Sequence, residues 1–324
     1  MGVEISVICL TYNSDINKLL TTLNSVIQQK NCRFEIIIAD DGSGDNKFEE
    51  VETFLSANDF QNYKLIPNAE NKGIIKNFLS AIQLANGRYI KYISPGDYLY
   101  DENTLEYIYE FMKKYDASIA FGKAVYYSDN SGELDVFNLM APVVTDIYDV
   151  RENHYNYDDV LKHIMLFDDV VLGAVVVAKR DIFEKYLLEI SSSVVYIEDN
   201  TILHLVTLDK QRIFYMDRYI LWYESDSGIS TNVNRGFIEK IEQDMLNCYK
   251  YISNKYPSNN LLRLAYLKRK YLSENSRIAS FFVKRIIDFY YGRILFKFKR
   301  RKIKKNYIAK DFDRQKYYKW QIGI

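Results

Sequence analysis

Short apolar, β-branched runs alternate with amphipathic segments through the first hundred residues. Residues 4–10 (EISVICL) and 34–39 (FEIIIA) are continuous apolar runs, which are typical of strands buried on both faces. Between these two runs, apolar side chains recur with the spacing of one helix face, at positions 16, 19, 20, 23, 26 and 27. The alternation continues, with helices and strands expected at 47–57, 63–67, 71–86 and 89–93. Short links between strands and helices predict an α/β fold with a mostly parallel central sheet.

The second part of the chain has a less regular pattern. Strands are expected at 119–127, 170–179 and 213–223, and helices at 181–189 and 200–209. The segment 128–160 predicts loop and short helix, and 225–236 predicts a polar loop. From 237 to 305 the pattern is helical, with a break near Pro257.

Polar clusters follow three of the expected strands at the point where each strand ends. They are Thr11-Tyr12-Asn13, Asp40-Asp41 and Ser94 to Asp97. In parallel α/β sheets, ligands bind beyond the carboxyl ends of the strands. This coincidence is the first indication of function in the chain.

Each acidic residue in these clusters also has a purely local explanation. Asp40-Asp41 can form a turn with Gly42, and Pro95-Gly96-Asp97 is a common turn sequence. Asp199, which precedes an expected helix, can act as an N-cap. The functional alternatives are hydrogen bonding to a nucleotide base or ribose, a divalent cation bridging phosphates, and a general base.

Four segments together, in this order and spacing, resemble glycosyltransferase family 2 with the GT-A fold over about residues 4–230. The segments are SVICLTYNS (6–14), EIIIADDGSGDN (35–46), NKGIIKNFLSAIQLANGRYIKYISPGDYL (71–99) and YIEDN (196–200). The resemblance implies a Rossmann-like catalytic domain over 1–236, with a nucleotide-binding half (1–100) and an acceptor half (101–236). We expect residues 237–324 to form a helical, basic C-terminal region.

The resemblance implies roles for eight side chains. Asp97 is expected to bind a divalent metal, Mn²⁺ or Mg²⁺, and Asp199 to be the catalytic base. Asp40 is expected to take the uracil or ribose edge, with Asp41 supporting it. The other expected contacts of the nucleotide and its phosphates are Thr11, Asn13, Lys76 and Asn77.

The chain departs from the family pattern at the expected metal site. The family commonly has Asp-x-Asp-Asp where this chain has Ser94-Pro95-Gly96-Asp97, so two carboxylates are missing. Asp226 is a candidate replacement, and its alternative is a solvated loop aspartate.

The activity implied is inverting transfer of a hexose or N-acetylhexosamine from a nucleotide diphosphate sugar, with UDP expected, to an acceptor hydroxyl. The expected setting is synthesis of a surface polysaccharide or glycoprotein glycan, with a glycan, lipid-linked sugar or glycoprotein as acceptor. The alternative is a non-catalytic GT-A-like protein that supports a partner transferase.

Charge is unevenly distributed along the chain. Lys+Arg and Asp+Glu are both 43, yet residues 263–305 carry 15 basic and two acidic side chains, a net +13. Within 277–299 an apolar stripe with basic flanks is expected at Ala279, Val283, Ile286, Ile287, Tyr290, Ile294 and Phe298. This pattern suits a helix lying on an anionic membrane, and the alternative is a helix packed on the body; nucleic acid is not expected.

The sequence lacks the motifs of several other classes of protein. No Walker-type glycine loop occurs, and no G-x-G-x-x-G follows the first strand. His154, His163 and His204 have no zinc spacing, and we expect His204 to pack or face solvent. Three cysteines, no apolar leader and no apolar run of about 18–20 residues favour a cytoplasmic protein, peripheral on the inner face of the cell membrane.

Overall fold

The apolar runs of the first hundred residues form the parallel half of one sheet. The computed structural model describes residues 2–130, 133–150, 155–225, 235–274, 276–307 and 312–321. The parallel strands lie in the order β3-β2-β1-β4 and are β1 (Ile5–Thr11), β2 (Phe34–Asp40), β3 (Tyr63–Pro67) and β4 (Tyr89–Ile93). The amphipathic segments between them are α1 (Ile16–Ile27), α2 (Phe48–Ala57) and α3 (Ile74–Leu84). The inner boundary of this half is therefore set by β4, whose carboxyl end leads into the Ser94–Asp97 turn.

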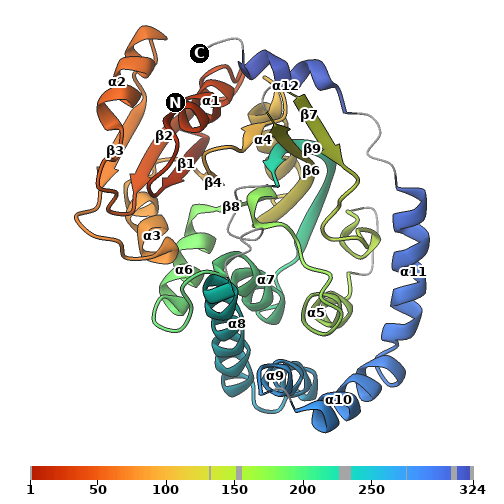
Figure 1. Cartoon of the computed structure of the whole chain (residues 1–324). Coiled ribbons are helices and arrows are strands. Elements are labelled where there is room, and N and C mark those ends of the chain that lie inside the picture. The colour runs from red at the N-terminus through yellow and green to blue at the C-terminus, as the bar shows by residue number, and fades with distance from the viewer. Residues whose placement is uncertain are drawn as a thin grey trace.

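The other half of the sheet is mixed (Figure 1). The sheet continues from β4 as β8-β6-β9-β5, and β7 pairs with β6. These strands are β5 (Tyr98–Leu99), β6 (Ile119–Asn130), β7 (Glu133–Phe137), β8 (Val176–Lys179) and β9 (Ile213–Glu224). β8 is antiparallel to both β4 and β6, whereas β9 runs parallel to β6. The carboxyl ends of β6 and β9 consequently lie at the same edge as that of β4, and this half adds antiparallel pairs to the parallel sheet that the pattern predicts.

Two segments differ from the sequence expectations. The strand expected over 170–179 starts only at Val176, because Gly173–Val175 forms a 3₁₀ turn, η2. The region expected as loop and short helix contains β7, another 3₁₀ turn η1 (Asp146–Tyr148) and α5 (Tyr157–Leu166). The Asn156 side chain accepts hydrogen bonds from the first N–H groups of α5, which fixes where that helix begins.

Helices of the second half cover the sheet and lead to the C-terminal region. They are α4 (Thr104–Lys114), α6 (Arg180–Ile190) and α7 (Glu198–Leu208). α6 packs against both α3 and α7, so it joins the two halves of the sheet on one face. The aliphatic residues of all these elements share one large buried core.

The C-terminal region is helical, as its sequence pattern predicts. Its helices are α8 (Arg235–Lys255), α9 (Asn260–Ser273), α10 (Arg277–Phe289), α11 (Arg293–Asn306) and α12 (Arg314–Gln321). α8 to α11 curve around the molecule, and α12 returns to lie beside α1 (Figure 1). Trp320 on α12 is fully buried; its indole N–H donates to the Leu99 carbonyl at 2.9 Å, and its own carbonyl accepts from Asn24 at 2.8 Å. No helix in the described ranges is long and apolar enough to cross a membrane.

Candidate active site

The end of β2 is joined to the end of β1 by the Asp40 carboxylate. This buried carboxylate accepts hydrogen bonds from Thr11 Oγ1 at 3.0 Å and from Ser43 N and Oγ at 2.7 and 2.6 Å. Ser43 Oγ also accepts from the backbone N–H of Asn13 at 2.7 Å. Asp40 therefore holds both loops in place, and its contact with a base or ribose stays a prediction.

Asp41 points to a different segment, as alternation along an extended chain requires. Its carboxylate accepts from the backbone N–H groups of Lys72 and Gly73, at 2.8 and 3.0 Å, just before α3 begins. Burial raises the pKa of Asp41, although these hydrogen bonds oppose the shift. Asp41 thus fixes the start of α3, and its supporting role at the nucleotide stays a prediction.

The two expected contacts on α3 have different surroundings. Lys76 is exposed, whereas Asn77 is buried. The Asn77 amide donates to the Ala39 carbonyl at 2.9 Å and accepts from Asn68 Nδ2 at 2.9 Å. Asn77 accordingly attaches α3 to the end of β2, and direct nucleotide contacts by either residue stay predictions.

Asp97 lies on a tight turn that is held from two sides. The turn closes with Asp97 N donating to the Ser94 carbonyl at 3.0 Å, and Gly96 has a φ of 97° that favours glycine. Gly96 N donates to Thr22 Oγ1 of α1 at 3.0 Å. Asp97 Oδ1 accepts from the backbone N–H of Glu224, at the end of β9, at 3.1 Å. The local turn explanation is thus correct, and the same turn buries the carboxylate at the carboxyl edge of the sheet.

Two charged residues beside Asp97 were missed by the sequence analysis, and the first is Lys91. Lys91 on β4 is fully buried and donates to the carbonyls of Tyr92 and Ala174. Burial lowers the pKa of Lys91 to about 7 and raises that of Asp97 to about 7. The only sequence signal for Lys91 is a basic residue within an apolar strand.

Glu224 is the second, and it places another carboxylate against the Asp97 turn. A Cβ on Gly96 would lie 2.4 Å from Glu224 Oε2, so only glycine allows this approach. Glu224 Oε1 accepts from Lys18 Nζ of α1 at 2.6 Å. Asp226, the replacement carboxylate considered from the sequence, lies outside the described residues. Glu224, two residues earlier, is the neighbour that the structure shows.

Asp199 sits in the first turn of α7, over the backbone of Gly173. The N-cap of α7 is Ile197, so the capping explanation for Asp199 is wrong. Asp199 Oδ1 accepts from the backbone N–H of Asn200 at 2.6 Å. A Cβ on Gly173 would lie 2.2 Å from Asp199 Oδ2 and 2.7 Å from Tyr92 Oη. The carboxylate therefore packs directly between η2 and the end of β4.

Tyr92 lies near carboxylates that come from distant parts of the chain. Burial raises the pKa of Tyr92 far above its ordinary value, and the charges of Asp199, Glu198 and Asp97 raise it further. The phenol oxygen is buried and has no hydrogen-bond partner among the described residues. Asp97 and Asp199, 102 positions apart in the sequence, thus both lie near enough to this side chain on β4 for their charges to act on it.

Glu198 and Asp199 form a buried acidic pair. Glu198 is 7% exposed, and its Oε2 atom has no partner within the described part of the chain. Burial raises the pKa of both carboxyl groups, and each negative charge disfavours the other. This environment makes the pair more basic than ordinary carboxylates.

The segment before this pair is held by Asp244 of α8. The buried Asp244 carboxylate accepts from three successive backbone N–H groups, those of Val195 at 3.0 Å, Tyr196 at 2.7 Å and Ile197 at 3.3 Å. Val195 also packs near Gly73, where a Cβ would lie 3.2 Å from its Cγ1. Residues 195–197, which precede the acidic pair, are thus fixed between the start of α3 and the C-terminal region.

Replacing Asp244 by alanine is expected to lower both stability and activity. Three backbone N–H groups would lose their acceptor, at a cost of about 1–3 kcal/mol, and Asp199 would lose its fixed position. The melting temperature and kcat should both fall. Glu242→Ala, an exposed change on the same helix, should alter neither. An Asp244→Ala protein with lowered melting temperature and unchanged kcat would show that Asp244 does not position Asp199 for the reaction.

The comparisons with known proteins now decide the family. Residues 6–189 match the sequence profile described as Glycosyl transferase family 2, which is more than half of the chain. The chain belongs to glycosyl transferase family 2. The family and the fold expected from the four sequence segments are confirmed.

Curated relatives of this family-2 chain match parts of it. Glycosyltransferase GlyG of Streptococcus pneumoniae is 30% identical over 135 residues, which cover 41% of this chain and 42% of GlyG. The Escherichia coli protein WfgD, named UDP-Glc:alpha-D-GlcNAc-diphosphoundecaprenol beta-1,3-glucosyltransferase, is 28% identical over 127 residues, which cover 39% of this chain and 48% of WfgD. The chain thus spans less than half the length of these relatives.

Solved structures show the same fold at low sequence identity. Staphylococcus aureus TarS 1–349 in complex with UDP-GlcNAc has a TM-score of 0.57 at 19% identity, covering 83% of this chain and 73% of TarS. The mannosyltransferase PcManGT from Pyrobaculum calidifontis, in complex with GDP-Man and Mn²⁺, has a TM-score of 0.57 at 12% identity, covering 85% and 73%. At these identities the likeness establishes the GT-A fold.

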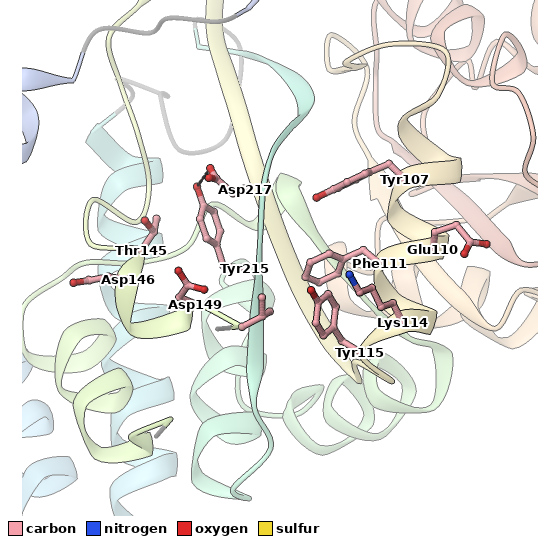
Figure 2. A pocket seen from close by; sticks show the side chains of 11 residues that line it. Tyr107, Glu110, Phe111, Lys114, Tyr115, Thr145, Asp146, Asp149, Tyr215 and Asp217 are labelled. Atoms are coloured by element: carbon pink, nitrogen blue, oxygen red, sulfur yellow. Dashed lines mark hydrogen bonds between the residues drawn. The ribbon is translucent and has the colours of Figure 1, made fainter. Parts of the chain in front are cut away.

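A cavity of about 740 Å³ is lined by none of the expected site residues; its lining is shown in Figure 2. Tyr107 and Phe111 of α4, with Tyr115 just after its end, line one side, and Tyr215 and Asp217 of β9 lie across from them. Because β9 runs in the same direction as β4, its first residues lie at the edge opposite the candidate active site. The site is therefore identified by its carboxylates and not by this hollow.

The described residues contain no histidine in the candidate active site and no ready-made cluster of metal ligands. His204 is buried against Tyr249, and burial lowers its pKa to about 3, so it is neutral and packed as expected. Within the described ranges, no three His, Cys, Asp or Glu side chains gather as metal ligands. Mg²⁺ needs only one or two carboxylates when phosphates and water complete its shell, so Asp97 with Glu224 beside it fits such an ion.

Proposed function

We propose that this protein is an inverting glycosyltransferase that moves a hexose or N-acetylhexosamine from a UDP-sugar to an acceptor hydroxyl. The observation that carries the proposal is that Asp97 and Asp40 lie at the same edge of the sheet, with Asp199 packed beside Tyr92 near the end of β4. The UDP-sugar donor is supported by the WfgD name and by the TarS complexes with UDP and UDP-GlcNAc. The acceptor setting is synthesis of a surface polysaccharide or glycoprotein glycan.

Asp199 is the general base of this proposal. The acceptor oxygen attacks the anomeric carbon from the face opposite the nucleotide, the bond from that carbon to UDP breaks, and Asp199 takes the hydroxyl proton. The raised pKa strengthens the carboxylate as a base. The buried, unpartnered Tyr92 Oη lies beside Asp199.

Asp97 is the residue that would hold a divalent cation, with Glu224 at the same turn. When bound, Mn²⁺ or Mg²⁺ supplies electrostatic stabilisation of the leaving diphosphate. In this proposal Thr11, Asn13 and Lys76, which lie in or beside the segments held by Asp40 and Asp41, contact the nucleotide and its phosphates.

The basic C-terminal region brings the enzyme to an anionic membrane on the cytoplasmic side. The net charge of +13 over 263–305 supports this location, and a lipid-linked sugar is the acceptor that such a location favours. Glycans and glycoproteins are the other acceptor classes.

A panel of nucleotide sugars tests the proposed reaction. One UDP-sugar with Mn²⁺ should raise the melting temperature, and the same donor should be slowly hydrolysed without acceptor. Stabilisation without hydrolysis or transfer would favour the non-catalytic partner role. No response to any UDP-sugar would contradict the proposed donor.

A further inference from the structure

One side of α10 and the beginning of α11 exposes a set of large apolar side chains. Their exposed fractions lie between 48 and 83%. The set, here called the apolar face, consists of Ile278, Phe281, Phe282, Ile286, Phe289, Tyr290, Leu295 and Phe298. An exposed patch of this kind on a protein surface marks an interaction site.

The opposite side of α10 is already used for packing. Ser280, Val283 and Ile287 are buried, and α10 contacts α9. Val283 and Ile287 belong to the stripe expected to meet a membrane, so that expectation is wrong for these two side chains. Phe281, Phe282 and Phe289 were not in the stripe and are exposed instead. α10 therefore packs on the body through one face and presents a different apolar face to solvent.

Cations are dense along the two helices that carry the apolar face. Residues 277–306 contain eleven Lys or Arg and a single acid, Asp288. Asp288 is itself neutralised by Arg293 at 2.7 Å and Lys297 at 3.2 Å. The Arg285 guanidinium lies 5.0 Å from the Phe281 ring and 5.8 Å from the Phe289 ring, within the apolar face.

We infer that the apolar face docks into the headgroup region of an anionic lipid bilayer. Aromatic and aliphatic side chains enter the interface while neighbouring Lys and Arg contact lipid phosphates. A second copy of the chain is a poor occupant, because a symmetric contact would place two sets of eleven cations together. The inference rests on the proposed membrane location and names the surface that makes the contact.

Tryptophan fluorescence tests this contact directly. The two native tryptophans, Trp222 and Trp320, are fully buried, so a Phe282→Trp variant of the full chain reports on the apolar face. Vesicles containing phosphatidylglycerol should shift its emission to the blue, and brominated lipids should quench it. Pure phosphatidylcholine vesicles should produce neither change at low protein concentration. An equal response to both vesicles, or no response, overturns the inference.

Removing the apolar face should weaken vesicle binding. Phe281→Ser with Phe289→Ser should lower partition into phosphatidylglycerol vesicles by at least ~10-fold with an unchanged melting temperature. Leu188→Ser on α6 is the matched control, since Leu188 is comparably exposed elsewhere. Unchanged binding of the double variant to these vesicles overturns the inference. A blue shift of the Phe282→Trp emission that appears without lipid when the protein concentration is raised also overturns it, because a second copy would then cover the apolar face.

The same variants separate this inference from the proposed reaction. UDP-sugar hydrolysis without vesicles does not involve α10, so it should be equal in the double variant and the unaltered protein. Vesicle binding by a protein that has no response to any UDP-sugar would leave the docking surface standing and refute the reaction.

Discussion

Asp199→Asn is expected to lower the rate of glycosyl transfer by at least ~100-fold while donor binding is retained. Asparagine has the same shape, so packing over Gly173 and the bond from Asn200 can persist, but it cannot take the acceptor proton. Steady-state kinetics should show the loss in kcat, and UDP-sugar titration should show an unchanged affinity. Near-normal turnover would mean that another group is the base.

The pH profile supplies an independent check on Asp199. Burial raises its pKa, so kcat should fall as pH decreases at a pH above the ordinary aspartate range, because the protonated carboxyl cannot accept the proton. Asp181→Asn, an exposed change at the start of α6, should leave both kcat and the profile unaltered. A profile that is flat through this region would contradict the assignment.

The second large effect is expected on removal of the metal or of its carboxylate. EDTA should abolish transfer, and Asp97→Asn should lower it by at least ~100-fold, since the developing charge on UDP would lose its main electrostatic partner. Adding Mn²⁺ should rescue the EDTA-treated enzyme and leave the variant inactive.

A binding measurement separates metal binding from other roles of Asp97. In the unaltered protein, Mn²⁺ should increase the rise in melting temperature that UDP produces. This increase should disappear in Asp97→Asn. Asp135→Asn, an exposed change on β7, should keep it. Full activity without a divalent ion would give Asp97 a different role, and its neighbour Lys91, buried two strand positions before Ile93, would then be the first residue to examine.

Much of the first half could be predicted from local pattern. Apolar runs such as 34–39 can be buried only as central strands, and helical spacing between them leaves a parallel sheet as the connection. The carboxyl ends of those strands then meet at one edge, which is why Asp40 and Asp97 could be singled out.

The support of the site could not be predicted in the same way. Asp244 and Glu224 contact the site from segments far along the chain, and Lys18 reaches Glu224 from α1; no local period marks any of them. Gly173 matters only because Asp199 and Tyr92 lie over it. Asn77 is a further example, since only the structure shows that its amide bonds to Ala39 and Asn68.

The C-terminal helices show the same division. Spacing and charge predicted helices rich in Lys and Arg, yet they could not tell which apolar side of α10 would pack on α9. A helix with apolar residues on more than one side has alternative ways to dock, and the choice depends on the surface that receives it.

By itself, the sequence determined the alternation of strands and helices, the acidic residues at the strand ends and the family, because period, turn chemistry and short motifs act between near neighbours. Only the tertiary structure decided that Asp97 and Asp199 both lie near Tyr92, that Asp244 holds the segment before Asp199 and that Phe281, Phe282 and Phe289 remain exposed. These are contacts between distant segments, and their geometry exists only after the sheet has formed and the helices have packed on it.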